Sequence, residues 1–188
     1  MTTTTFSNDA PAGAAHVHAA RVRTLDDLAA LGSDELDRLY RDAPAPTGVE
    51  RLAGRPKGRM LAVRHTDGTP LFGLLRAFAS SNAFPWDGKT FEELQPEEGG
   101  GINRIKLLAR RFDWFPFRTR LEPSVVDGRA CVYLDYEQPG NPFFIAKIRD
   151  EIREVSPDLW LGPAMIKTGP RSAAHVLWFA VDFGEPSV

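Results

Sequence analysis

The spacing of apolar residues in the first part of the chain predicts two short helices. Hydrophobic side chains recur there at helical intervals, which gathers them on one face. The stripe of the first helix consists of Leu25, Leu28 and Leu31. The second helix is expected to begin at Ser33, and its stripe consists of Leu36, Leu39 and Tyr40. Pro44 and Pro46 then end it, because proline cannot continue a helix.

From Gly101 onward the pattern is typical of consecutive β-strands. Short apolar segments alternate with turn residues, and we expect strands over 102–111, 114–124, 129–138, 159–169 and 172–183. Asp127-Gly128 predicts a hairpin, because these residues favour the positive φ angles of a type I′ turn. Side chains in the segment 131–136 alternate between two faces. Cys131, Tyr133 and Asp135 share one face, and Val132, Leu134 and Tyr136 share the other.

Three further segments lie between these regions. We expect a short strand over 58–64, a helix over 70–79 that starts at Pro70, and a turn at 86–89. Trp86 in that turn is expected to form part of the wall of the core.

The segment 141–157 interrupts the strand pattern and predicts an amphipathic helix. Asn141 is a favourable N-cap, Pro142 suits the first helical position, and Pro157 ends the segment. The apolar stripe consists of Phe144, Ile145, Ile148, Ile152 and Val155. Since such a stripe has to be buried, we expect this helix to lie across the mouth of a barrel as a lid.

Consecutive strands with short turns favour a mainly β domain of the α+β class, in which an antiparallel sheet closes into a small barrel. The predicted barrel carries N-terminal helices and the lid helix in its C-terminal half. An open sheet packed against helices is the alternative. A chain of 188 residues suits one domain, which we expect over 23–188, after a disordered leader of residues 1–22.

The composition limits the binding partners and the cellular compartment that we expect for the protein. The net charge of −2 gives no electrostatic reason to expect nucleic acid, and no apolar run is long enough to span a membrane. Cys131 is the only cysteine, which excludes a disulfide within the chain and suits the cytoplasm. No motif for a nucleotide or a metal occurs, so no cofactor is expected. His16 and His18 lack a third ligand. The sequence leaves open whether the protein forms a homodimer.

A few polar residues in apolar strands are the candidates for chemistry. Asp135 needs a partner if it is buried, and Arg118 and Arg120 on the preceding strand are able to supply one. Tyr133 shares the face of Asp135 and completes this polar group, which is either a structural ion pair or a reader of a ligand head group. His175 is expected to share a face with Leu177, Phe179 and Val181, either as a satisfied core histidine or as a general base.

Several short motifs resemble those of the lipocalin-like proteins of the GXWXG-containing family. They are LAGRPKGRM at 52–60, PWDGKTFEEL at 85–94, the Asp127-Gly128 hairpin, and RDEIR followed by LWLG. Pro56 stands where the family pattern has tryptophan. The resemblance covers about 36–183 and implies a calycin-type barrel, without implying an activity or a catalytic residue.

Three functions follow from this architecture. The first is binding of a hydrophobic small molecule with a polar or acidic head group. Its cavity walls would be Leu107, Trp114, Phe117, Trp178 and Phe179, and its head-group readers Arg118, Arg120 and Tyr133. The second is a cofactor-free isomerase, cyclase or dehydratase that uses Asp135 or His175 as acid and base. The third is a solid structural or partner-binding domain, which a cavity below about 300 Å³ would favour.

Overall fold

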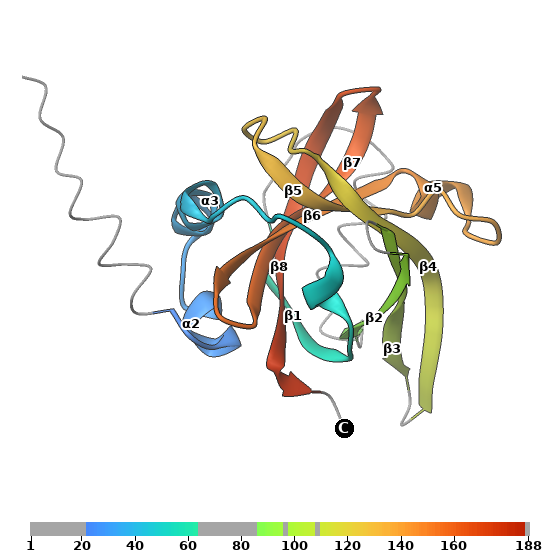
Figure 1. The fold of residues 1–188 in the computed structure, drawn as a ribbon, viewed down its shortest axis with the longest axis horizontal. Helices are drawn as coiled ribbons and strands as arrows, with labels where there is room; N and C mark the ends of the chain where they lie inside the picture. Colours follow the sequence, from blue (N-terminus) through green and yellow to red (C-terminus); the bar gives the residue numbers. More distant parts are fainter. Residues whose placement is uncertain (1–21, 64–85, 96–97, 108–109, 187–188) are drawn as a thin grey trace, which may run out of the picture.

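A closed β-barrel forms the body of the protein. The computed structural model describes residues 22–63, 86–95, 98–107 and 110–186. Each strand pairs antiparallel with the next along the chain, and β8 returns to β1 (Figure 1). The strands are β1 (Pro56–Val63), β2 (Trp86–Gln95), β3 (Glu98–Leu107), β4 (Arg110–Pro123), β5 (Ala130–Asp135), β6 (Ile148–Ser156), β7 (Leu159–Gly169) and β8 (Ser172–Pro186). The predicted antiparallel barrel is therefore confirmed, and the open sheet is excluded.

Helices cover part of the outer face of the barrel. The predicted N-terminal pair is confirmed as α2 (Leu25–Ala29) and α3 (Ser33–Asp42), and the 3₁₀ turn η1 (Glu50–Leu52) precedes β1. Thr24 caps α2, since its hydroxyl accepts a hydrogen bond from the backbone N–H of Asp27. Helix α2 contacts β1 and β8, and α3 contacts β6 and β7. Figure 1 shows both helices on one side and α5 (Phe143–Ala146) on the other.

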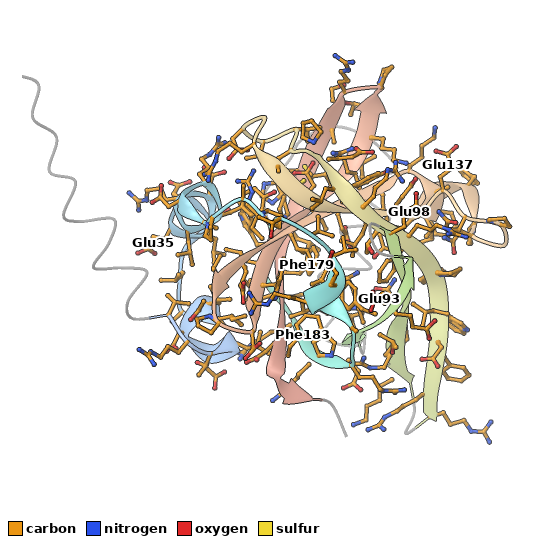
Figure 2. The ribbon with its side chains drawn as sticks, in the orientation of Figure 1. Glu35, Glu93, Glu98, Glu137, Phe179 and Phe183 are labelled. Atoms are coloured by element: carbon orange, nitrogen blue, oxygen red, sulfur yellow. The ribbon has the colours of Figure 1, made fainter. Side chains whose placement is uncertain are left out.

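Two hydrophobic clusters lie on the two faces of the barrel wall. The outer cluster joins the helices to the sheet and includes Leu28, Leu36, Tyr40, Leu161 and Trp178. The inner cluster fills much of the barrel and includes Phe91, Phe117, Val132, Leu134, Ile152, Trp160, Leu177, Phe179 and Val181. In Figure 2, Phe179 lies near the middle of the barrel, whereas Glu35 and Glu137 lie at its periphery. Only the inner cluster is able to surround a ligand inside the barrel.

The predicted lid helix is wrong over most of its length. Only one helical turn, α5, forms at its start, and the chain continues as strand β6 from Ile148 to Ser156. The periodicity misleads because the charged residues of this strand are buried. Arg149, Asp150, Glu151 and Arg153 are each less than a tenth exposed. Pro157 therefore ends a strand, and Asp158 follows it in a tight turn with φ of 65°.

Two predicted turns also differ from the structure. The hairpin between β4 and β5 is present, but its loop spans 124–129, and Gly128 with φ of 76° is its left-handed residue. The two-residue type I′ turn at Asp127-Gly128 is thus wrong. Residues 86–89 belong to strand β2 instead of a turn, although Trp86 packs against the inner cluster as expected.

Some expectations fall outside the part of the chain that the structure describes. The helix expected over 70–79 and residues 1–21 of the expected leader lie there. Val22, the last residue of that leader, is described and is buried in the outer cluster. Among the helices described, none is both long and apolar enough to cross a membrane. Within the same described ranges, no group of three histidine, cysteine or acidic residues is arranged to hold a metal ion.

Candidate functional site

A pocket of about 130 Å³ lies inside the barrel. Its walls are mostly apolar and come from β1, β2, β3, β4, β6, β7, β8, the residue that follows β5 and the single turn of α5. The apolar lining residues are Met60, Trp86, Ile105, Phe115, Ile145, Ile148, Ala164, Met165, Ile166, Val176, Leu177 and Phe179. Four polar residues complete the lining: Lys89, Asn103, Tyr136 and Asp150. We call these four the inner polar cluster.

The inner polar cluster is a compact hydrogen-bond network. The Lys89 ammonium Nζ donates to Asn103 Oδ1 at 2.9 Å, to the Tyr136 hydroxyl at 2.5 Å and to Asp150 Oδ2 at 3.1 Å. The Tyr136 hydroxyl donates to the same Asp150 oxygen at 2.9 Å. Three protons are available on a lysine ammonium group. Lys89 therefore has a partner for each of its protons.

Four aromatic rings enclose the charged end of Lys89. Its Nζ lies between 5.1 and 5.3 Å from the ring centroids of Trp86, Phe117, Tyr136 and Phe179. Aromatic faces attract a cation, but they solvate it less well than water does. Burial accordingly lowers the pKa of Lys89, although the charge and hydrogen bond of Asp150 oppose that shift.

One oxygen of the cluster has no partner. Asp150 Oδ1 accepts no hydrogen bond from any residue that the structure describes. Among the described residues, one buried side-chain atom each of Asp87, Arg104 and Trp178 also lacks a hydrogen-bond partner, and none of these three residues lines the pocket. A buried acceptor that stays unsatisfied costs about 1–3 kcal/mol. Asp150 Oδ1 is thus the polar atom in the pocket that is left for a ligand or water.

Irregular strand geometry positions these side chains. Gly88 has φ of 115°, and the register between β2 and β3 shifts between Trp86 and Gly88, just before Lys89. A Cβ on Gly88 would lie 2.6 Å from the carbonyl oxygen of Pro56, so only glycine allows this approach of β1 and β2. Phe115 is the extra residue of a bulge in β4, with φ of 60°, and it lines the pocket.

The predicted group around Asp135 forms, but on the outer face of the barrel. Arg120 Nη1 lies 3.2 Å from Asp135 Oδ2, and the Tyr133 hydroxyl donates to Asp135 Oδ1 at 2.9 Å. Lys167, which the sequence analysis did not consider, adds an ion pair at 3.2 Å. These residues line a polar surface groove of about 280 Å³, together with Arg149 and others. None of them lines the pocket inside the barrel.

The hydrogen bonds of the groove shift the pKa values of its members. Burial raises the pKa of Asp135, but the backbone N–H of Glu137, the Tyr133 hydroxyl and Lys167 outweigh it, and the net pKa is lowered. Burial lowers the pKa of Lys167, but its contacts with Tyr133 and Asp135 outweigh that effect and raise it overall. Burial raises the pKa of Tyr133 to about 12. The two charged residues, Asp135 and Lys167, therefore stabilise each other in their ionised forms.

The other predicted arginine and aromatic residues are spread over both faces. Arg118 stands opposite Asp135 in the sheet register, yet its side chain is exposed and forms an ion pair with Glu98 at 3.9 Å. Trp114 is 44% exposed at the surface. Phe117 and Phe179 belong to the inner cluster, whereas Trp178 is buried on the outer side. The side chain of Leu107 lies outside the described part.

His175 also lies apart from the pocket. Its ring packs on Trp178 with the ring centroids 4.5 Å apart, and its Nε2 is 3.0 Å from the carbonyl oxygen of Leu177. A register shift between β7 and β8 leaves Val176 unmatched, so His175 does not share a face with Leu177 as predicted. His175 is half-buried, and this geometry agrees with a histidine that is satisfied by its neighbours.

The sequence does not reveal the inner polar cluster, because the members of this cluster carry misleading local signals. Lys89 follows Asp87-Gly88, which reads as a turn, and Asp150 lies in a segment that reads as the polar face of a helix. Tyr136 was assigned to the correct face, opposite Asp135. This position of Tyr136 is the signal in the sequence that points to the cluster. A tyrosine on the same face as Val132 and Leu134 requires a hydrogen-bond partner inside the barrel.

Comparison with known proteins adds little to this geometry. No protein-family model matches the chain, and no curated protein matches it. A solved structure of a protein from Thermomonospora curvata is similar over 81% of this chain and 87% of that one, at 20% sequence identity and a TM-score of 0.46.

Proposed function

We propose that the barrel binds a small, largely apolar molecule that carries one polar group and donates a hydrogen bond to Asp150. The observation that carries this proposal is the unpartnered Asp150 Oδ1 in an otherwise apolar pocket. A buried polar atom without a partner is costly, and a ligand that supplies the missing donor recovers that cost.

The size of the pocket limits the ligand. An apolar cavity of about 150 Å³ accommodates benzene, and ligand sites for larger organic molecules begin at about 300 Å³. With about 130 Å³, the pocket fits a single small ring or a short branched chain rather than a lipid. Because this volume is below about 300 Å³, volume alone favours the solid structural barrel, and the free carboxylate oxygen is what favours binding over it.

The hydrogen-bond inventory favours one kind of head group. Lys89 has no spare proton, since Asn103, Tyr136 and Asp150 accept all three. An anionic head group would therefore meet the Asp150 carboxylate without finding a free donor among the lining residues that the structure describes. A hydroxyl, by contrast, donates to Asp150 Oδ1 directly. Among polar and acidic head groups, the proposal therefore favours an alcohol or phenol over a carboxylate.

An enzyme in the same cavity is the second candidate. Lys89, Tyr136 and Asp150 form a buried group of acids and bases in contact with the pocket, which suits proton transfer in an isomerase, cyclase or dehydratase. Burial raises the pKa of Tyr136 well above its ordinary value, and Asp150 adds to that shift. Asp135 and His175 would have no access to a substrate bound there, because neither lines the pocket.

The methionines offer a direct test of binding. The chain has three, and Met60 and Met165 line the pocket, while Met1 lies outside the described residues. With ¹³C-methyl methionine, cyclopentanol at millimolar concentration should shift the methyl signals of Met60 and Met165. Cyclopentane, which has no donor, should bind more weakly by about tenfold, the equivalent of one hydrogen bond.

Two variants sharpen the test. Ala164→Leu extends a side chain into the pocket and should abolish the shifts at Met60 and Met165. Lys167→Met alters only the outer groove and should leave the shifts as in the wild type. Equal binding of cyclopentanol and cyclopentane would refute the role of Asp150. Unchanged methyl signals with both ligands would favour the solid barrel.

The proposal also covers the evolutionary relationship of the protein and its location in the cell. It includes a distant kinship with the GXWXG-containing proteins, supported by the motifs at 52–60 and 85–94 and by the lipocalin-like barrel. It also includes a cytoplasmic location, supported by the lone cysteine, Cys131, which is buried and free.

A further inference from the structure

We infer that Lys89 captures small aldehydes or ketones as a reversible imine inside the barrel. This inference rests on the proposed function, because it requires a small apolar molecule to occupy the same pocket. It goes further by naming the reactive atom, Lys89 Nζ, and the chemical class of the ligand, a carbonyl compound.

The position of Lys89 carries the inference. Its side chain is only 3% exposed, and it reaches the pocket between apolar walls and aromatic rings. The chain contains five lysines, and the structure describes all of them. Three of the others, Lys57, Lys106 and Lys147, are exposed, and Lys167 is half-buried on the outer face. Lys89 is therefore the lysine that meets an apolar carbonyl compound out of water.

The protonation state of Lys89 supports the same step. Only a neutral amine attacks a carbonyl carbon, and lysines in water are protonated at neutral pH. Burial lowers the pKa of Lys89, while its contacts raise that of Lys167. The neutral fraction rises roughly tenfold for each unit by which the pKa falls. Desolvation of this kind is a recognised way of activating a lysine nucleophile.

The cluster holds the groups that the reaction requires. Asp150 accepts a proton from the Lys89 ammonium group, and the neutral Nζ then forms a bond to the carbonyl carbon while the C–O π bond breaks. The carbonyl oxygen takes that proton from Asp150 and becomes a hydroxyl. A second proton from nitrogen, again passed by Asp150, lets the hydroxyl leave as water. The product is a protonated imine beside the Asp150 carboxylate, so atoms and charge balance.

The unpartnered oxygen fits this sequence. The hydroxyl of the addition intermediate is a hydrogen-bond donor, and Asp150 Oδ1 is the acceptor left free in the pocket. The Tyr136 hydroxyl donates to the other oxygen, Asp150 Oδ2, and so holds the carboxylate in one orientation. The same atom that would receive an alcohol ligand thus receives the alcohol formed during the addition.

Reductive trapping tests the inference on the wild-type protein. Cyclopentanone has nearly the size and shape of cyclopentanol and adds the carbonyl group. Incubation with cyclopentanone and cyanoborohydride, followed by peptide mapping, should find a cyclopentyl group on Lys89 in at least about tenfold excess over Lys167. Cyclopentanol should compete with this labelling, because it occupies the same pocket.

Variants separate the possible outcomes. Ala164→Leu keeps Lys89 but fills the pocket, and it should reduce the labelling of Lys89 at least tenfold. Lys167→Met should leave that labelling intact. Lys89→Met should remove the label altogether, with circular dichroism to confirm folding. Labelling spread evenly over the five lysines would overturn the inference.

The methionine titration distinguishes this failure from that of the proposed function. If cyclopentanol shifts the signals of Met60 and Met165 but no label appears on Lys89, the imine is refuted and non-covalent binding stands. If neither the shifts nor the label appear, both proposals are refuted.

Discussion

Two clusters with the same three residue types lie on the two faces of the barrel wall. Inside, Lys89 pairs with Asp150 at 3.1 Å, and Tyr136 donates to Asp150 at 2.9 Å. On the outer face, Lys167 pairs with Asp135 at 3.2 Å, and Tyr133 donates to Asp135 at 2.9 Å. The contacts are nearly identical in length. The clusters differ in their exposure to water and in the number of their hydrogen-bond partners.

Burial differs first. The side chains of Lys89 and Asp150 are 3% and 6% exposed, whereas those of Lys167 and Asp135 are 22% and 16% exposed. The pKa of the inner lysine is accordingly lowered, and that of the outer lysine is raised. Identical contacts thus leave the inner amine closer to the neutral, reactive state, because desolvation outweighs the carboxylate only inside the barrel.

Partners differ second. Both carboxylate oxygens of Asp135 accept hydrogen bonds, from Tyr133, Arg120, Lys167 and the backbone N–H of Glu137. Asp150 has one oxygen, Oδ1, that accepts no hydrogen bond from the described part of the chain. The outer groove is larger, at about 280 Å³ against 130 Å³, yet its charges already satisfy one another. Spare hydrogen-bonding capacity, more than volume, supports the proposal that the inner pocket binds the ligand.

The largest effect is expected for Lys89→Met. This change leaves the Asp150 carboxylate buried without its ion partner, and removing one member of a buried pair costs about 3–5 kcal/mol. Urea denaturation at neutral pH would measure the loss in the free energy of unfolding. A loss below about 1 kcal/mol would mean that the pair is not buried as described.

A double substitution should recover most of that loss. In Lys89→Met/Asp150→Leu apolar side chains replace both members of the buried pair, and well-packed apolar replacements of buried ion pairs are often neutral or stabilising. We expect a coupling free energy of about 2–3 kcal/mol in the double-mutant cycle. Simple addition of the two single losses would show that the residues do not interact.

Acid should weaken the outer cluster. The pKa of Asp135 is lowered from its ordinary value of 3.8, so the folded state favours the ionised form. The resulting stabilisation is present above that value and is lost as the pH falls through the folded pKa. The difference in unfolding free energy between wild type and Asp135→Asn should therefore be larger at about pH 6 than at about pH 3. A difference independent of pH would contradict the assignment.

The smallest effect is expected for Lys167→Met. Its ion pairs with Asp135 and Glu137 are partly exposed to water, and such pairs contribute about 0–1 kcal/mol. The same urea experiment measures it beside Lys89→Met, which it matches in chemistry. If the two substitutions cost the same, burial does not distinguish the clusters.

The sequence predicts the barrel better than it predicts the site. Strict alternation in 131–136 correctly assigned Val132, Leu134 and Tyr136 to one face, and the two N-terminal stripes gave α2 and α3. Strand β6 was not predicted, because Arg149, Glu151 and Arg153 are buried as ion pairs on its outer face. A hydrophobicity pattern records which residues usually meet water, and it has no means of recording which charges have found a partner.

The sequence does not predict the site for a second reason, which is that the strands around the site are irregular. The register shifts beside Gly88, Phe115 and Val176 each change which side chains face the pocket. One extra residue reverses the alternation that follows it. His175 was thereby assigned to the interior and Lys89 to a turn, although Lys89 is the lysine that the fold places inside.

The most direct test of the comparison is a crystal structure of the protein with a bromine-substituted cyclopentanol. Anomalous scattering from bromine would show which cluster takes the ligand. Binding at Asp150 predicts a bromine peak inside the barrel beside Met60 and Met165, with the ligand hydroxyl within hydrogen-bond distance of Asp150 Oδ1. A peak in the outer groove beside Tyr133 and Arg120, with an empty barrel, would contradict it.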